Sequence, residues 1–166
     1  AASSWLIYRF LYRFTSHTVI SLLAALVISF ASTYWGQMII AEVYALNVFL
    51  SLLFFDVLMK IREQNNVTAR QFFVLGSVGA LALSNHWPIF VITGPFYLFF
   101  IERSWVKKKN VCAFLGGLSL VILPYLLMWW RSLQGPEVSF LGEIQSLKDW
   151  VKYIARSYYS STDVSV

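Results

Sequence analysis

Charged residues are scarce in this sequence. They make up 13% of its 166 residues, whereas 58% are hydrophobic. The hydrophobic residues form long runs in place of the short alternations that are typical of a soluble domain. This excludes an ordinary soluble globular fold. The sequence predicts an all-α polytopic membrane protein with about five transmembrane or re-entrant helices and a C-terminal amphipathic helix.

Cysteine is almost absent as well. The single cysteine, Cys112, allows no internal disulfide, and its apolar setting predicts no reactive thiolate. No group of His, Cys and carboxylate residues has metal-ligand spacing, and no Gly-rich loop suits a nucleotide, so we expect no metal site. The net charge of +5 comes from basic residues at the ends of apolar runs, as membrane topology alone places them. We therefore expect membrane lipids and not nucleic acid as partners, with a weak attraction of the 107–109 lysine run for anionic lipid.

Five apolar runs predict membrane segments within a first region, residues 1–131. They lie near 16–35, 44–59, 71–84, 88–101 and 111–130. The third and fourth runs are short and interrupted, and freed backbone groups inside a membrane need partners from protein or from water in a cavity. We therefore expect a polar pocket near Asn85 and His86. Residues 132–166 form a second region, non-cytoplasmic or interfacial, with an amphipathic helix over about 140–159.

The distribution of Lys and Arg predicts the orientation. Basic residues fall in alternate loops, which the positive-inside rule assigns to the cytoplasm. They are Arg9, Arg13, Lys60, Arg62, Arg70, Arg103, Lys107, Lys108 and Lys109. Glu42, Asn85, His86 and the tail after Arg131 then face the opposite side of the membrane. Three separate pieces of chain thus bring polar residues to one non-cytoplasmic surface, in a bacterial inner membrane, which we favour, or in the endoplasmic reticulum.

Several of these polar residues also have a purely structural interpretation. Glu42 can be a carboxylate anchored at the membrane interface, and His86 can cap a broken helix. Asn47 suits a hydrogen bond between helices in lipid. Asp56 precedes Lys60 by one helical turn, so we expect an ion pair.

Four short motifs occur in an order that resembles a known family. The first is Ala-Glu-Val-Tyr within residues 35–47, and the second is Ser-Asn-His at 84–86. Leu-Pro-Tyr at 123–125 then leads to Arg131, and an aromatic and basic segment follows at 150–159. Together they resemble the central part of glycosyltransferase family 117, formerly a domain of unknown function, which includes the transmembrane protein O-mannosyltransferase. The resemblance covers most of this chain.

The resemblance implies a partial GT-C-type helical bundle whose site faces away from the cytoplasm. Such an enzyme transfers a sugar from a polyprenyl-phosphate donor to a hydroxyl of a protein or glycan. It needs a base near the acceptor hydroxyl and groups that stabilise the departing phosphate. By this resemblance Glu42 and His86 are the catalytic candidates, and Arg131 and Arg156 are candidates to bind the phosphate. Arg131 can instead be an interfacial anchor. The substrate-binding candidates are Tyr44, Asn47, Asn85, Arg131, Arg156 and Tyr158.

One departure from the family pattern qualifies the enzyme interpretation. Families of this architecture usually carry a catalytic carboxylate in the first non-cytoplasmic loop, and no such loop precedes the region seen here. If the chain is a fragment, we expect that carboxylate upstream of Ala1; if the chain is complete, the departure argues against an enzyme. Two other functions stay open: a transporter or flippase, suggested by the interrupted helices, and a non-catalytic membrane subunit of a larger complex, suggested by the missing loop.

Overall fold

The computed structural model describes residues 2–39, 43–64, 66–135, 144 and 146–155, and these residues contain helices and no strand. The chain divides into two compact units, residues 1–121 and 122–166. By length and composition, three helices can cross a membrane: Tyr44–Arg62, Ala69–Leu98 and Lys108–Ser132. The predicted all-α polytopic fold is confirmed.

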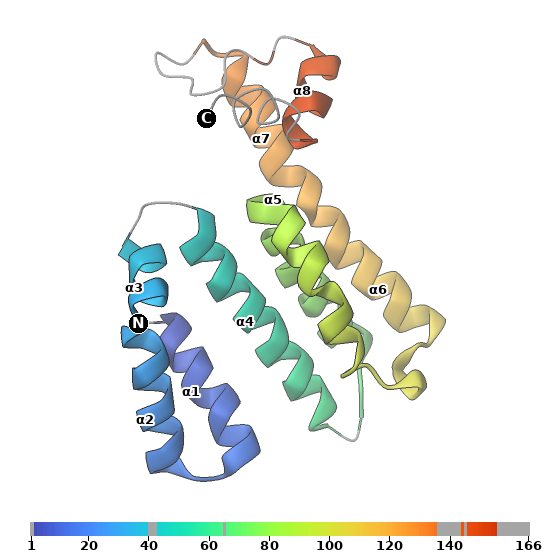
Figure 1. Cartoon of the computed structure of the whole chain (residues 1–166). Coiled ribbons are helices and arrows are strands. Elements are labelled where there is room, and N and C mark those ends of the chain that lie inside the picture. Colours follow the sequence, from blue (N-terminus) through green and yellow to red (C-terminus); the bar gives the residue numbers. More distant parts are fainter. Residues whose placement is uncertain (1, 40–42, 65, 136–143, 145, 156–166) are drawn as a thin grey trace. The chain divides into compact units, whose positions relative to one another are not determined.

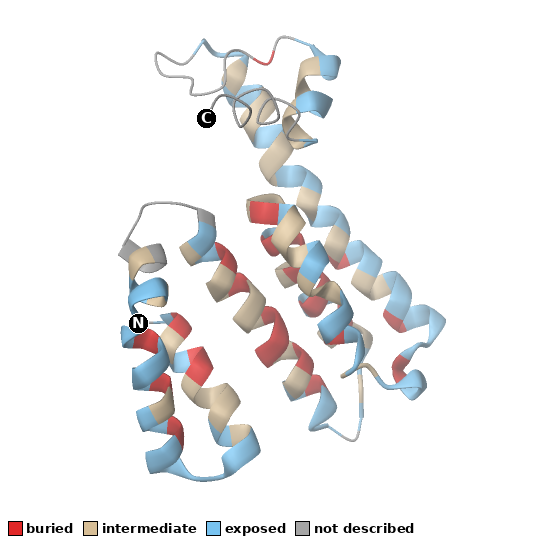
Figure 2. Ribbon diagram, in the orientation of Figure 1, coloured by how far each residue is buried: buried red, intermediate tan, exposed pale blue. Residues whose placement is uncertain are grey.

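The surface of the first unit is unusually apolar. Figure 2 shows exposed residues along α2 (Thr18–Phe30) and α6 (Lys108–Leu118), and many of these are large hydrophobic side chains. Phe99 is 84% exposed and Ile92 is 77% exposed. A soluble protein rarely exposes contiguous apolar surface of this kind, whereas lipid is a suitable solvent for it. The protein is a membrane protein.

Ion pairs join α1 (Ala2–Thr15) to α4 (Val43–Arg62) at one end of the unit, which we call the basic end. Asp56 is 4% exposed and its carboxylate lies 3.0 Å from Lys60 Nζ, which confirms the expected pair. Arg13 Nη1 and Arg9 Nη1 contact the same carboxylate at 2.8 and 3.3 Å. A buried carboxylate needs such neutralisation, so this cluster fixes α1 against the C-terminal half of α4.

α5 (Ala69–Leu98) is a hairpin of two helical arms, folded at His86, whose backbone is non-helical (φ −155°, ψ 78°). In a straight helix, Phe72 and Tyr97 would be about 37 Å apart. They instead belong to one apolar core and line one pocket, so the second arm returns beside the first (Figure 1). The arms measure about 25 and 18 Å. The break that the sequence predicted near Asn85 is thus confirmed as a reversal.

Two glycines bring the first arm of α5 into backbone contact with α6. A Cβ added to Gly76 would lie 2.1 Å from the carbonyl oxygen of Phe114, and one added to Gly117 would lie 2.1 Å from that of Phe73. A larger residue at either position therefore fits only if one of the two helices moves. Small residues allow this kind of close helix approach in membranes.

The remaining elements of the first unit subdivide the predicted runs. The run at 16–35 contains α2 and the start of α3 (Ser32–Ile39), separated at Ala31, whose ψ of 134° is extended. The run at 44–59 lies inside α4, the run at 71–84 lies inside the first arm of α5, and the run at 88–101 begins in the second arm. The run at 111–130 contains most of α6 and the short turn η2 (Ser119–Val121), and it continues into α7 (Ile122–Ser132) of the second unit. Their placement in the bilayer stays a prediction.

The second unit is built from α7 and α8 (Leu147–Ile154). Trp150 Nε1 donates to the carbonyl oxygen of Tyr125 at 3.0 Å, and its ring lies 5.9 Å from that of Trp129. The Ile144 N–H donates to Ser132 Oγ at 2.7 Å. α8 begins at Ser146, whose hydroxyl accepts from the Asp149 N–H and so satisfies a free donor of the first turn. It is the described part of the amphipathic helix expected at 140–159.

Candidate functional site

His86 occupies the turn between the two arms of α5. The backbone leaves the helical conformation here because Pro88, two residues later, has no N–H for the helical bond to residue 84; it lies instead in the first turn of the second arm, where that N–H is not needed. The imidazole is only 8% exposed. A titratable side chain is therefore held inside the bundle at a point where the helix backbone is interrupted, an arrangement that is common at functional sites in membranes.

Tyr44 meets His86 across the bundle. The two ring centroids are 5.5 Å apart, with 40° between the ring planes, although 42 positions separate the residues in sequence. Tyr44 lies in the first turn of α4 and is partly exposed. The structure thus brings together two of the residues that the sequence proposed for one site.

Asn47 lies one turn after Tyr44 and is 2% exposed. Its Oδ1 has no hydrogen-bond partner among the residues that the structure describes, and the same holds for the buried Oγ of Ser51, one turn further along α4. The expected bond from Asn47 Oδ1 to another helix is therefore not found within the described chain. Leaving such an oxygen unpaired costs about 1–3 kcal/mol, which is a reason to look for a ligand or partner next to it.

The remaining predicted site residues fall into three groups. Asn85 is half-buried in the α5 turn beside His86. Arg131 is exposed near the end of α7, in the second unit. Glu42, Arg156 and Tyr158 lie outside the described residues.

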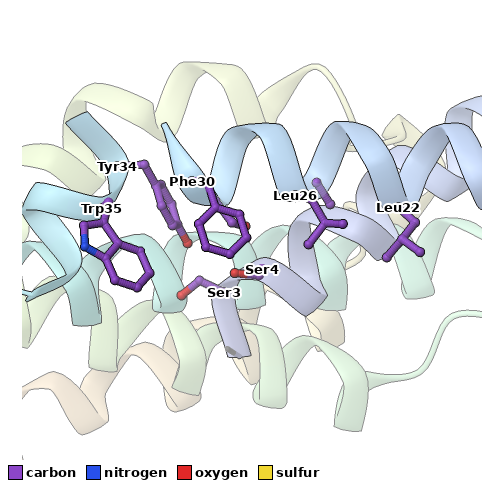
Figure 3. Close-up of a pocket in the computed structure, with 9 residues that line it drawn as sticks. Ser3, Ser4, Leu22, Leu26, Phe30, Tyr34 and Trp35 are labelled. Carbon is purple, nitrogen blue, oxygen red and sulfur yellow. The ribbon is translucent and has the colours of Figure 1, made fainter. Parts of the chain in front are cut away.

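A groove between α1, α2 and α3 was missed by the sequence reasoning. It encloses about 400 Å³ and is lined by Ser3, Ser29, Tyr34 and Trp35, among others. Figure 3 shows the Tyr34 hydroxyl directed toward the serines at the start of α1. The signal available was the four-residue spacing of the small residues Ser21, Ala25 and Ser29, which are the buried residues of α2.

The charged residues of α4 show at which end of the first unit this site lies. About 27 Å of helix separate Tyr44 from Arg62, close to the ~30 Å thickness of a hydrocarbon core. Tyr44 and His86 therefore lie at the end of the unit opposite the basic end. Among the described residues, no three His, Cys, Asp or Glu side chains are grouped as metal ligands would be.

The comparisons with known proteins identify the family. The model of the protein O-mannosyl-transferase TMEM260 N-terminal domain matches residues 8–111. This match includes Tyr44, Asn47, Asn85 and His86. Searches of curated proteins and of solved structures found no match. Because the family model covers more than half of the chain, the resemblance noted in the sequence is confirmed, and this membrane protein belongs to the family of the TMEM260 protein O-mannosyl-transferase N-terminal domain.

Proposed function

We propose that this chain serves in a membrane glycosyltransferase that moves a sugar from a polyprenyl-phosphate donor to a hydroxyl of a protein or glycan. The observation that carries the proposal is the contact between Tyr44 and His86, in a chain of the O-mannosyl-transferase family. Both residues lie in the matched region, and both are types that bind or protonate sugar and phosphate groups.

Each residue has a chemical role in this proposal. The His86 imidazole donates a hydrogen bond or a proton to the departing phosphate oxygen. The Tyr44 ring offers an aromatic face and a hydroxyl to the sugar, and Asn47 Oδ1 accepts a hydrogen bond from a sugar hydroxyl. Glu42, two residues before Tyr44, acts as the general base or orients one. Asn85 contributes to the same turn, while Arg131, Arg156 and Tyr158 are proposed as further substrate contacts.

The proposed side of the reaction is non-cytoplasmic. Lys60 and Arg62 end α4, and Lys107 and Lys108 begin α6, all at the basic end. The positive-inside rule places that end in the cytoplasm. A sugar carried by a membrane lipid and an acceptor hydroxyl would then meet at Tyr44 and His86 on the far surface. We favour a bacterial inner membrane as the location.

The test uses Glu42→Gln in the full-length native protein, with Glu102→Gln as its matched control. Glu102 is an exposed glutamate on the loop after α5, close to the basic end. We expect Glu42→Gln to lower the rate of sugar transfer at least 100-fold, the usual contribution of a general base, with membrane insertion unchanged. Glu102→Gln should transfer at the native rate. Normal transfer by Glu42→Gln would contradict the proposed role.

The folded α5 also favours a second candidate, a transporter or flippase. Interrupted helices are usual elements of transport sites in membranes, and α5 is interrupted at His86. Reconstitution of the full-length protein in liposomes distinguishes the two functions. Carrier-dependent movement of a labelled lipid-linked sugar across the bilayer, with no transfer to an acceptor, would favour transport.

A further inference from the structure

A second pocket lies near the basic end, away from Tyr44 and His86. It has a volume of about 300 Å³ and is lined by α4, both arms of α5, the loop at 99–107 and α6. Its lining is apolar apart from Tyr97, whose hydroxyl donates to the carbonyl oxygen of Ser51 at 3.4 Å. The pocket therefore offers an occupant apolar surface and almost no hydrogen bonds.

The pocket opens toward the part of the surface that suits lipid. Two of its lining residues, Leu98 and Val106, are mostly exposed, and Phe99 beside them is exposed as well. Gly94 lines the pocket, and a Cβ added there would meet no atom within 4 Å, so a larger side chain can be placed at this position. A flexible hydrocarbon chain can enter from the bilayer and bury its methylenes in this space.

Three cations flank the loop and the start of α6 that form part of this pocket. Arg103 follows the lining residue Ile101 by two positions, Lys107 follows Val106 directly, and Lys108 precedes Val111 by three. The side chains of all three cations are exposed. The described part of this loop carries a single acidic residue, Glu102. The local charge is positive, and it favours an anionic headgroup.

We propose that this pocket binds one acyl chain of an anionic phospholipid from the leaflet at the basic end, with the headgroup phosphate held by Arg103, Lys107 and Lys108. The apolar lining recognises the chain, and the basic loop recognises the charge. Because the bound lipid contacts α4, α5 and α6 together, it stabilises the packing of these three helices. This role is separate from sugar transfer and does not rest on it.

The test measures lipid binding to the full-length protein in detergent micelles. Dioleoyl-phosphatidylglycerol and dioleoyl-phosphatidylcholine are titrated separately, and apparent affinities are taken from the rise in the unfolding temperature, since a ligand of the native state raises it. The anionic lipid should bind more tightly. Lys107→Gln combined with Lys108→Gln should weaken phosphatidylglycerol about 25-fold, at roughly fivefold for each cation, and leave phosphatidylcholine unchanged.

Two further variants fill the pocket. Gly94→Leu should weaken both lipids at least tenfold, because each methylene kept out of the pocket costs about fourfold in affinity. Its matched control is Gly36→Leu in α3, where an added Cβ also meets nothing within 4 Å but no pocket residue is involved. Val111→Phe fills the pocket from α6 and serves if Gly94→Leu proves unstable without lipid.

Three results would overturn the proposal. One is native phosphatidylglycerol affinity in both pocket-filling variants, and another is an unchanged preference for the anionic lipid after loss of both lysines. The third result comes from a further probe, a polyprenyl phosphate. If Gly94→Leu weakens the binding of that lipid alone, the pocket holds the sugar carrier and not a phospholipid.

Discussion

The contact between α5 and α6 gives a sharp prediction, because it depends on Gly76 and Gly117 each having a hydrogen atom where any other residue has a Cβ. Gly76→Ala places a Cβ 2.1 Å from the Phe114 carbonyl oxygen. Ordinary contacts begin near 3.4 Å, so one helix must move by about 1.3 Å. The opposing atoms belong to backbone and cannot rotate away as a side chain can. Gly116→Ala is the matched control, since its Cβ would lie 3.9 Å from the Phe73 ring, an ordinary distance.

The expected magnitudes follow from two opposing effects. Overpacking a well-filled contact costs about 1–3 kcal/mol, and the upper value applies here because backbone has to shift. Replacing glycine by alanine in a helix returns about 1 kcal/mol. Gly76→Ala should therefore lower the free energy of unfolding by about 2 kcal/mol, whereas Gly116→Ala should raise it by up to about 1 kcal/mol.

Unfolding of each variant by sodium dodecyl sulfate in detergent micelles, followed by far-ultraviolet circular dichroism, measures this difference. Gly117→Ala should behave like Gly76→Ala, because its Cβ meets the Phe73 carbonyl oxygen from the other side of the same contact. Equal shifts of the unfolding midpoint for Gly76→Ala and Gly116→Ala, or native stability of Gly76→Ala, would contradict this backbone contact.

Four other substitutions test separate parts of the structure. Asp56→Asn should lower the free energy of unfolding by about 2 kcal/mol in the same assay. This is less than the usual cost of breaking a buried ion pair, because two of the cations around Asp56 are partly exposed. Glu63→Gln, at a more exposed ion pair, should lower it by under about 1 kcal/mol. Asn47→Leu should stabilise by about 1 kcal/mol, since it removes a buried oxygen that has no partner among the described residues, and sugar transfer should fall because a proposed substrate contact is lost. Trp150→Phe removes the bond to Tyr125, so hydrogen exchange in α8 should accelerate.

Local chemistry explains which features could be predicted from the sequence. The Asp56–Lys60 pair is set by helical spacing, and the interruption near His86 is set by Pro88 together with polar residues inside an apolar run. Both depend on neighbours within a few residues. The all-α fold followed from apolar runs of membrane length, and the family from short motifs.

Long-range geometry accounts for what could not be predicted. Arg9 and Arg13 looked like topological charges, because nothing local indicates that α1 packs beside Asp56. The reversal at His86 depends on one pair of backbone angles and on the core that the two arms share. The contact of Tyr44 with His86 likewise needs the tertiary fold, although both residues were proposed for the site.

The most direct test of the proposed site compares the two histidines of the chain. His86→Gln in the full-length protein should lower kcat for sugar transfer at least 100-fold. Its unfolding midpoint should stay as high as that of variants that still transfer sugar. His17→Gln is the control, since His17 only caps α2, accepting from the Ile20 N–H at 3.4 Å, near the basic end. Equal transfer rates for the two variants, both close to native, would contradict a catalytic site at Tyr44 and His86.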